Sequence, residues 1–567
     1  MINMEFAELI KTPMVGRVVL QQPRGESVGG TLCITGHHLI VSSRTEKAEE
    51  IWLLHRNVDA IERKQSGPNS GIITIRCKDL RILHLEIVGS EEFHNVSNSL
   101  EWLSNLEEPI HWYPFFYRPM FDIVENGWTA FNIENEFAEL QMQSDDWRIT
   151  KVNTDFSICN SYPQTMIVPK NIDDKTLAIV SNFRQHGRFP ILSYFHKENK
   201  TVLLRSSQPM TGQNNKRCKE DERLLNSVLS SGKRGFIIDT RSQNLAQLAK
   251  TRGGGFESEV HYPQWRRICK SIERYPLFQD SFCKLVEACN DTSSGMDKFL
   301  SRLENSDWLS HIKDILNCAC LVAQCIGQDG ACILVHGSEG MDSTLQVTSL
   351  GQVILNPDSR TIRGMQSLIE REWIQNGHAF ATRCQHGAYS GTHKRNQAPT
   401  FLLFLDCVWQ VSQQFPCSFE FNDQFLIDLF DHAYSSQFGT FVGNNEKDKE
   451  NLDVKQKTVS LWSYMNHPDI LNTYFNPMYD PNNRVIWPSV APQSLVLWNG
   501  LFLRWVCDNS AQSEAWTTIK SIKDTDKELR SKVTKLRRQL MELQKETIIA
   551  GLITSPSAKT DVLVDTS

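Results

Sequence analysis

The first hundred residues alternate short apolar runs with turn residues, which is a pattern typical of β-strands. The segment Thr31–Ser43 (TLCITGHHLIVSS) is rich in β-branched residues and is broken at Gly36, so it predicts a β-hairpin. Ile51–Leu54 and Gly71–Ile75 are two further runs of strand length, and Arg81–Ile87 (RILHLEI) alternates apolar and polar residues. A period of two buries one face of a strand and leaves the other in water. We therefore expect several antiparallel strands here.

One amphipathic helix follows these strands. Ser90 is a residue type that often caps a helix N-terminus, and Glu91 and Glu92 lie where the first turn favours negative charge. Four apolar residues then recur at helical spacing: Phe93, Val96, Leu100 and Leu103. Strands closed by a C-terminal helix predict a pleckstrin-homology-like (PH-like) β-sandwich over residues 1–106.

The long central region, residues 119–505, alternates short apolar runs with helical segments, which is the pattern of an α/β domain. Leu177–Val180, Gly235–Asp239 and Ala331–Val335 are strand candidates, and the aromatic-rich segment Phe401–Phe415 has the composition of a core element. Asn445–Lys457 (NEKDKENLDVKQK) is almost fully polar, so we expect an exposed loop there, with a docking role left open. A polar linker, residues 107–118, separates this region from the first domain.

The C-terminal region carries apolar residues in alternating steps of three and four. This is an a/d heptad pattern of about three and a half repeats, interrupted once by Asp526. A long helix with an apolar seam is rarely stable alone in water, so we predict a coiled coil over residues 515–547, followed by a disordered tail at 548–567. The alternative is a helix that packs back on its own domain. The seam residues predicted to mediate oligomerisation are Ile522, Leu529, Val533, Leu536, Leu540 and Leu543.

Composition narrows the class of protein. At 567 residues, with 40% apolar and 22% charged residues, the chain fits two or three globular domains. A net charge of −6 gives no general attraction to nucleic acid. The fifteen cysteines are scattered and form no C-x-x-C pair, so we expect reduced thiols, no metal site and no cofactor. We also expect no signal peptide and no membrane span, since the most apolar stretch, Phe401–Val411, is short and contains Asp406.

The loop His336–Thr344 (HGSEGMDST) carries the strongest chemical signal. It lies between a predicted strand and a helical pattern at Leu345–Leu355, which is the arrangement of an anion-binding turn. Cysteine-dependent phosphatases use the pattern H-C-x-x-G-x-x-R-[ST] in this arrangement. The positions of the cysteine and the arginine hold Gly337 and Ser343 here. The nine positions of this vestigial loop are His336, Gly337, Ser338, Glu339, Gly340, Met341, Asp342, Ser343 and Thr344.

Both replacements remove chemistry that a phosphatase needs. Gly337 has no thiolate to attack phosphorus, and Ser343 cannot bind two phosphate oxygens as a planar guanidinium does. Asp342 could still protonate a leaving oxygen, but an acid without a nucleophile completes no cycle. A serine nucleophile would need an adjacent general base, which no spacing supplies. Taken alone, the loop could equally be an ordinary glycine turn.

The flanking sequence resembles the myotubularin family of phosphoinositide 3-phosphatases along nearly the whole chain. That family's loop reads H-C-S-D-G-W-D-R-T. The other matching blocks are Gly187–Tyr194, Arg205–Gly212, Ile238–Arg241, Gly253–Glu257, Ser359–Gly364, Leu368–Trp373, Gly377–His378, Arg383, Phe401–Gln410, Gln414–Asn422 and Gln437–Phe441. The resemblance implies a multidomain protein in which a PH-GRAM β-sandwich precedes an α/β cysteine-phosphatase-like domain and a C-terminal coiled coil. The two replacements most resemble the family's catalytically inactive members.

The resemblance also implies a function. Active members hold a second phosphate with an arginine at the position of Ala379, whereas the later arginine of that block remains as Arg383. These two residues are therefore a vestige of the substrate site. Inactive members form heteromers with active myotubularins and raise or redirect their activity, which implies a cytoplasmic adapter with peripheral association with endomembranes. Self-association, contact of the GRAM domain with phosphoinositide membranes, reassigned phosphatase chemistry and a role as a phosphoinositide sensor remain open alternatives.

Overall fold

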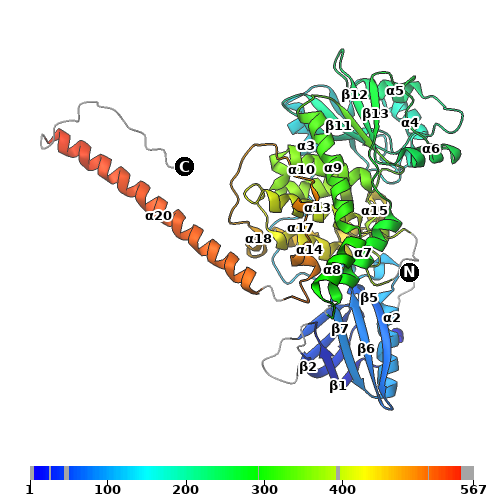
Figure 1. Ribbon diagram of the computed structural model, residues 1–567, viewed down its shortest axis with the longest axis vertical. Helices are drawn as coiled ribbons and strands as arrows, with labels where there is room; N and C mark the ends of the chain where they lie inside the picture. Colours follow the sequence, from blue (N-terminus) through cyan, green and yellow to red (C-terminus); the bar gives the residue numbers. More distant parts are fainter. Residues whose placement is uncertain are drawn as a thin grey trace. The chain divides into compact units, whose positions relative to one another are not determined.

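The structure is a computed structural model that describes residues 6–23, 27–43, 50–129, 131–291, 293–390, 396–507 and 510–550. The chain divides into two compact units, Met1–Cys507 and Asp508–Ser567, and each is described by itself. Figure 1 shows the first unit as two successive parts, a mainly β part in blue and a mixed α/β part in cyan to orange.

The N-terminal part is a seven-stranded antiparallel sheet in the order β4-β3-β2-β1-β7-β6-β5. Its strands are β1 (Met14–Gln21), β2 (Ser27–Ile34), β3 (His38–Ser43), β4 (Ile51–Leu54), β5 (Val58–Gly67), β6 (Ser70–Cys77) and β7 (Ile82–Val88). Side chains of β6 alternate between buried and partly exposed, as the period-two pattern predicted. The hairpin at Thr31–Ser43 is confirmed, because β2 and β3 pair across its turn.

The helix α2 (Ser90–Ser104) packs on this sheet, and a short helix, α1 (Phe6–Leu9), precedes the first strand. Phe93, Val96, Leu100 and Leu103 are buried, as predicted. The predicted cap was wrong, however. Gly89 is the N-cap residue, with a φ of 119° that favours glycine, and no side chain caps the helix.

The second part contains a five-stranded mixed sheet in the order β10-β11-β14-β12-β13 and a two-stranded sheet, β8-β9. Apart from the antiparallel β10–β11 pair, neighbours in the larger sheet run parallel. The strands are β8 (Trp147–Thr150), β9 (Met166–Pro169), β10 (Ile191–His196), β11 (Thr201–Ser206), β12 (Gly235–Asp239), β13 (Trp265–Cys269) and β14 (Ile333–His336). The predictions of β12 and of a strand before the signature loop are confirmed.

Helices surround this sheet and build most of the core. They are α3 (Ile133–Gln141), α4 (Asp174–Phe183), α5 (Lys219–Asn226), α6 (Gln243–Thr251), α7 (Tyr275–Asn290), α8 (Met296–Asn305), α9 (Trp308–Gly327), α10 (Ser343–Leu355), α11 (Ile362–Ile369), α12 (Phe380–Arg383), α13 (Thr400–Gln414), α14 (Asp423–Tyr434), α15 (Glu446–Asn451), α16 (Val454–Lys457), α17 (Leu461–Met465), α18 (Pro468–Tyr474) and α19 (Asn499–Phe502). The core element predicted at Phe401–Phe415 is confirmed as buried: it lies largely in the helix α13, whose residues Thr400–Val411 are all buried. By length and composition α9 could cross a membrane, but its apolar side chains belong to the main core cluster, so it is a core helix here.

Two sequence-based predictions for this part were wrong. Leu177–Val180, expected as a strand, lies in α4, because Asp173 caps a helix that buries Leu177 and Val180 one turn apart. Asn445–Lys457, expected as an exposed loop, forms α15 and α16 instead. There the side chain of Asn445 caps α15 and the buried Lys449 ammonium donates to the carbonyl of Thr440.

The two parts of the first unit meet through Asp59 of β5. Its carboxylate accepts hydrogen bonds from the backbone amides of Gly387 and Tyr389, both at 2.8 Å, and from the hydroxyl of Ser390 at 2.9 Å. Burial disfavours ionisation of the Asp59 carboxyl, but His386, the two backbone amides and the nearby Lys78 together lower its pKa. The first domain thus fixes the segment that follows Arg383.

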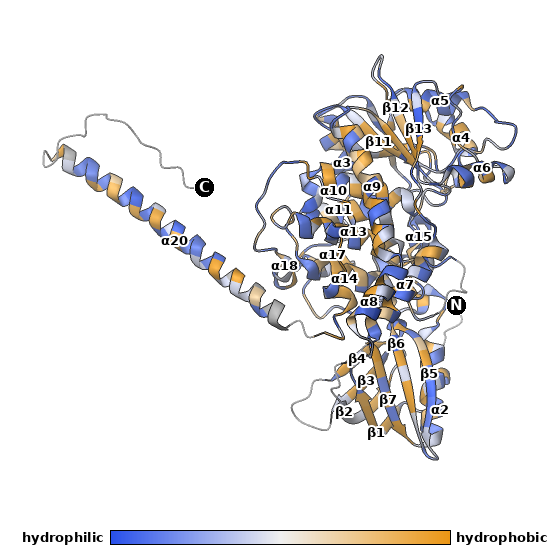
Figure 2. Cartoon of the chain, in the orientation of Figure 1, coloured by the Kyte–Doolittle hydropathy of each residue, from blue (hydrophilic) through white to orange (hydrophobic). Residues whose placement is uncertain are grey.

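The second unit contains one 40-residue helix, α20 (Ser510–Ile549). Figure 2 shows orange apolar residues recurring along it among blue polar ones. The predicted seam residues are exposed, including Leu529 at 53% and Leu536 at 62%. The helix is therefore confirmed and extends two residues into the predicted tail, whose residues 551–567 lie outside the described part. The coiled coil itself needs a second chain and stays a prediction.

Candidate functional site

The signature loop follows the central strand of the larger sheet. β14 lies between β11 and β12, and the chain turns through residues 337–342 into the N-terminus of α10. Ligand sites of α/β sheets lie at this carboxyl end of parallel strands. Gly340 has a φ of 75°, and a Cβ there would lie 2.5 Å from the carbonyl oxygen of Ser206, so only glycine allows the loop to approach β11. Strand, loop and helix occur in the predicted order.

A buried charge network anchors the start of the loop. The His336 ring nitrogen Nε2 lies 2.9 Å from Glu257, and the other oxygen of Glu257 accepts a hydrogen bond from Arg184 at 2.7 Å. Arg184 also binds both oxygens of Asp221. Burial disfavours a charged Glu257, but His336 and Arg184 hold the pKa of its carboxyl well below the usual range. His336, Glu257, Arg184 and Asp221 thus form one connected, buried network at the start of the loop.

Thr240, which follows β12, lies beside both positions that lack phosphatase residues. The Thr240 hydroxyl lies 2.8 Å from the hydroxyl of Ser343. A Cβ added to Gly337 would lie 2.7 Å from the same Thr240 oxygen and 3.3 Å from that of Ser343. The Thr240–Ser343 hydrogen bond thus occupies space that a side chain at position 337 would need.

The carboxylate of Asp342, the last residue of the loop before α10, is held by an arginine. Arg383 donates from Nε and Nη2 to the two carboxylate oxygens of Asp342, at 3.0 and 2.8 Å. Burial opposes the charge of Asp342, but the adjacent Arg383 lowers the pKa of its carboxyl. The two residues predicted as a vestige of the substrate site therefore differ in position. Arg383 contacts the loop, whereas Ala379 is the N-cap of α12 and does not line the cavity beside the loop.

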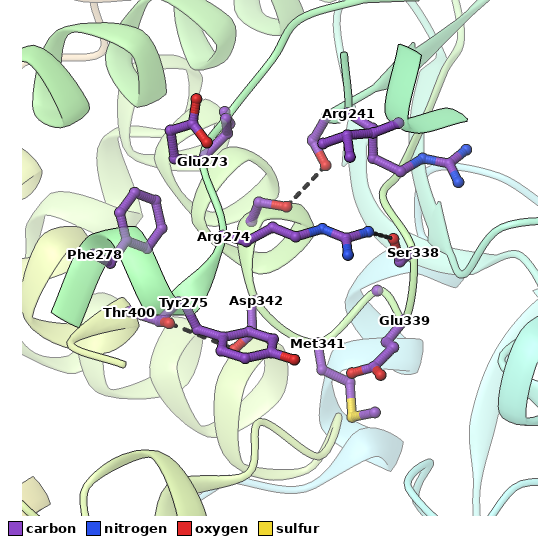
Figure 3. A pocket seen from close by; sticks show the side chains of 15 residues that line it. Arg241, Glu273, Arg274, Tyr275, Phe278, Ser338, Glu339, Met341, Asp342 and Thr400 are labelled. Atoms are coloured by element: carbon purple, nitrogen blue, oxygen red, sulfur yellow. Dashed lines mark hydrogen bonds between the residues drawn. The ribbon is translucent and has the colours of Figure 1, made fainter. Parts of the chain in front are cut away.

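A cavity of about 90 Å3 opens beside the loop (Figure 3). It is lined by Thr240, Arg241, Leu245, Ile272, Glu273, Arg274, Tyr275, Phe278, Ser338, Glu339, Gly340, Met341, Asp342, Ser343 and Thr400. Figure 3 shows the side chain of Arg274 crossing it towards Ser338, whose hydroxyl accepts a hydrogen bond from the guanidinium. A cation thus enters the cavity from the start of α7.

Sequence reasoning missed the roles of several residues that hold the loop or line this cavity. Thr240 and Glu257 lie within blocks that had been matched to a family, and so does Arg188, which donates to the carbonyl of Gly340 at 2.8 Å. The blocks marked these residues without giving their roles. Arg274 lies in no such block, and no local pattern points to it. Among the described residues, no three His, Cys, Asp or Glu side chains are grouped so that they could hold a metal ion.

Comparison with known proteins agrees with this architecture. Residues 14–104 match the GRAM domain described for MTMR6-9, and residues 112–450 match the myotubularin-like phosphatase domain. The chain belongs to the myotubularin family. The order of GRAM domain, phosphatase domain and signature loop is therefore that of a myotubularin.

Individual relatives cover nearly all of this myotubularin. Myotubularin-related protein 9 of Mus musculus is 58% identical over 543 residues, which are 96% of this chain and 99% of the relative. Myotubularin-related protein 9 of Caenorhabditis elegans is 44% identical over 96% of this chain and 99% of its own length. Phosphatidylinositol-3,5-bisphosphate 3-phosphatase MTMR8 of Gallus gallus is 36% identical over 88% of this chain and 80% of its own length.

Proposed function

We propose that this myotubularin is a catalytically inactive adapter that binds active myotubularin phosphatases through its coiled coil and increases or redirects their activity. The observation that carries the proposal is the state of the signature loop. Its fold is intact, yet Gly337 offers no nucleophile and Ser343 no guanidinium. The one remaining acid, Asp342, is held ionised by Arg383 and cannot donate a proton to a leaving oxygen.

The adapter role is supported by the exposed seam of α20. Ile522, Leu529, Val533, Leu536, Leu540 and Leu543 are each about half exposed or more. Apolar side chains in this arrangement gain stability when a second helix covers them. Relatives named as 3-phosphatases, such as MTMR8 of Gallus gallus, share most of this chain's architecture and are the partners we propose.

Binding could affect an active partner in two physical ways. If this chain binds the active partner only when the partner is folded, the partner's folding equilibrium shifts towards its native state. The complex would also carry a second GRAM domain, and two weak membrane contacts on one complex bind more tightly than one. We accordingly propose a cytoplasmic protein that associates peripherally with endomembranes as part of the complex.

Co-purification tests the adapter role directly. L529D/L536D/L543D places charge on the seam, and we expect it to abolish co-purification with a full-length 3-phosphatase relative. S521D/S531D/K535D places the same number of aspartates on the outer face and should leave co-purification intact, with helicity checked by circular dichroism. If the seam variant still brings down the relative, the adapter proposal is wrong.

A phosphatase assay tests catalytic inactivity. We expect no phosphate release from phosphatidylinositol 3-phosphate by the purified chain. Release that disappears in Asp342→Ala would establish reassigned chemistry, in which water replaces the missing thiolate. The same assay on the complex with an active relative measures how far this chain raises its turnover.

One observation favours a second candidate, a phosphoinositide sensor. Arg274 brings a guanidinium into the cavity, where it could bind a phosphate oxygen now that Ser343 cannot. Glu339 lines the same cavity and opposes an anion. Co-sedimentation with liposomes containing phosphatidylinositol 3-phosphate, compared between the wild type and Arg274→Glu, separates this function from the adapter role.

A further inference from the structure

The register of α20 determines which residues of the helix meet a partner. Counting heptads from Ile519 places two sets of residues on the seam. The a positions are Ile519, Asp526, Val533, Leu540 and Thr547, and the d positions are Ile522, Leu529, Leu536 and Leu543. β-Branched residues at a combined with leucine at d favour a parallel two-stranded coiled coil. In that geometry, each a residue faces an a residue of the partner helix.

Half of the positions that flank the seam are cationic, and cations outnumber anions there. The e positions are Lys523, Arg530, Arg537 and Gln544, and the g positions are Thr525, Lys532, Gln539 and Glu546. Four of these eight side chains are cations and one is an anion. Residues at e and g form the interhelical ion pairs that select a partner. A basic set of this kind fits a partner helix whose own e and g positions are acidic.

A second copy of this chain fits poorly for two reasons. In a parallel pair, a g residue meets the e residue of the following heptad on the other helix, so Lys532 would face Arg537 twice. Asp526, at an a position, would face the Asp526 of the second copy inside the seam. Within its own helix Asp526 accepts a hydrogen bond from Arg530 at 2.7 Å, but both side chains are mostly exposed, so this pair contributes little. Like charges in these places destabilise a homodimer.

We propose that α20 binds, as one strand of a parallel two-stranded coiled coil, a different chain. The helix of that chain has acidic residues at its e and g positions and a lysine or arginine opposite Asp526. The proposal rests on the adapter function and adds the chemistry by which the partner is chosen. Charge complementarity selects the partner, and the single charged seam position sets the register.

Two synthetic helices of the same heptad length test the proposal against the full-length chain. Both have isoleucine at a, leucine at d and lysine at the a position opposite Asp526. One has glutamate and the other lysine at every e and g position. At low salt we expect the glutamate peptide to bind about tenfold more tightly or better, since each interhelical pair changes the affinity by about a factor of two. The difference should shrink at high salt.

Charge-reversal variants supply the matched control. K523E/R530E/K532E/R537E should prefer the lysine peptide, whereas K527E/K535E/R538E/K545E changes the net charge equally on the outer face and should keep the original preference. The wild type should sediment as a monomer at micromolar concentration, and Asp526→Val should shift it towards a dimer.

Three results would overturn the proposal: equal binding of both peptides, binding of neither, or a stable wild-type homodimer that depends on Leu529 and Leu536. The adapter function fails separately. If the peptides bind equally but a 3-phosphatase relative still requires the seam for co-purification, only the charge selection is wrong. If the relative no longer requires the seam, the adapter proposal is wrong as well.

Discussion

Arg383 binds both carboxylate oxygens of Asp342 in this myotubularin, at 3.0 and 2.8 Å. The arginine comes from α12 and the aspartate from the signature loop, 41 residues apart in the chain. An ion pair of this geometry keeps the carboxyl charged and the loop in place. The residue that a phosphatase would use as an acid is therefore part of the structural frame here.

Removing either member of this pair should destabilise the protein. We expect Asp342→Asn and Arg383→Met each to cost about 2 kcal/mol, since the remaining partner keeps a poorly solvated charge or donor. The double variant should cost less than the sum of the two single variants. Thermal unfolding of the four proteins measures this coupling, and additive losses would contradict it.

The contact between Thr240 and Ser343 predicts how position 337 responds to a side chain. Gly337→Ala should lower the midpoint of thermal unfolding, because the new methyl group displaces the Thr240 hydroxyl from its hydrogen bond. A lost hydrogen bond of this kind costs about 1 kcal/mol. In a Thr240→Ala background the same change should cost almost nothing. Gly29→Ala, which meets no atom within 4 Å, is the control. Equal losses in both backgrounds would exclude the proposed contact.

The buried His378 predicts a loss of stability in mild acid. Burial lowers the pKa of this histidine from 6.5 to about 4, and its Nδ1 lies 2.8 Å from the carbonyl oxygen of Met341. Below pH 6.5 the unfolded chain binds a proton that the folded chain does not, so stability falls as the pH drops towards 4. From pH 7.5 to pH 5 this contributes a loss of about 2 kcal/mol.

His378→Asn keeps a donor near Met341 but does not titrate. Thermal midpoints of the variant should fall less than those of the wild type between pH 7.5 and pH 5. An unchanged pH dependence in the variant would show that His378 does not contribute.

The Asp59 contact predicts that the GRAM domain restrains the segment after Arg383. Asp59→Ala removes the acceptor for the amides of Gly387 and Tyr389, and we expect faster limited proteolysis within residues 384–390. Glu62→Ala on the same strand removes an exposed carboxylate that pairs with Arg76 and serves as the control. Equal cleavage rates in the wild type and Asp59→Ala would contradict the restraint.

Local patterns predicted a part of the elements. In the first domain β2, β3, β4, β6 and β7 were predicted, whereas β1 and β5 were not; β12, the strand–loop–helix around the signature loop, and α20 were also predicted from apolar runs and their spacing. Errors occurred where a short apolar run fits both a strand and a helix, as at Leu177–Val180. They also occurred where polar residues fold against a neighbour, as around Lys449.

The sequence by itself determined which groups are missing from the loop and which residues line the helix seam. The absence of a thiolate at Gly337 and of a guanidinium at Ser343 follows from the residue types alone, because each functional group belongs to a single side chain. Only the tertiary structure decided that Thr240 lies beside both positions, that Arg383 holds Asp342, and that Arg274 enters the cavity. These contacts join residues far apart in the chain. They depend on how helices and strands pack, which local hydrophobic periodicity does not specify.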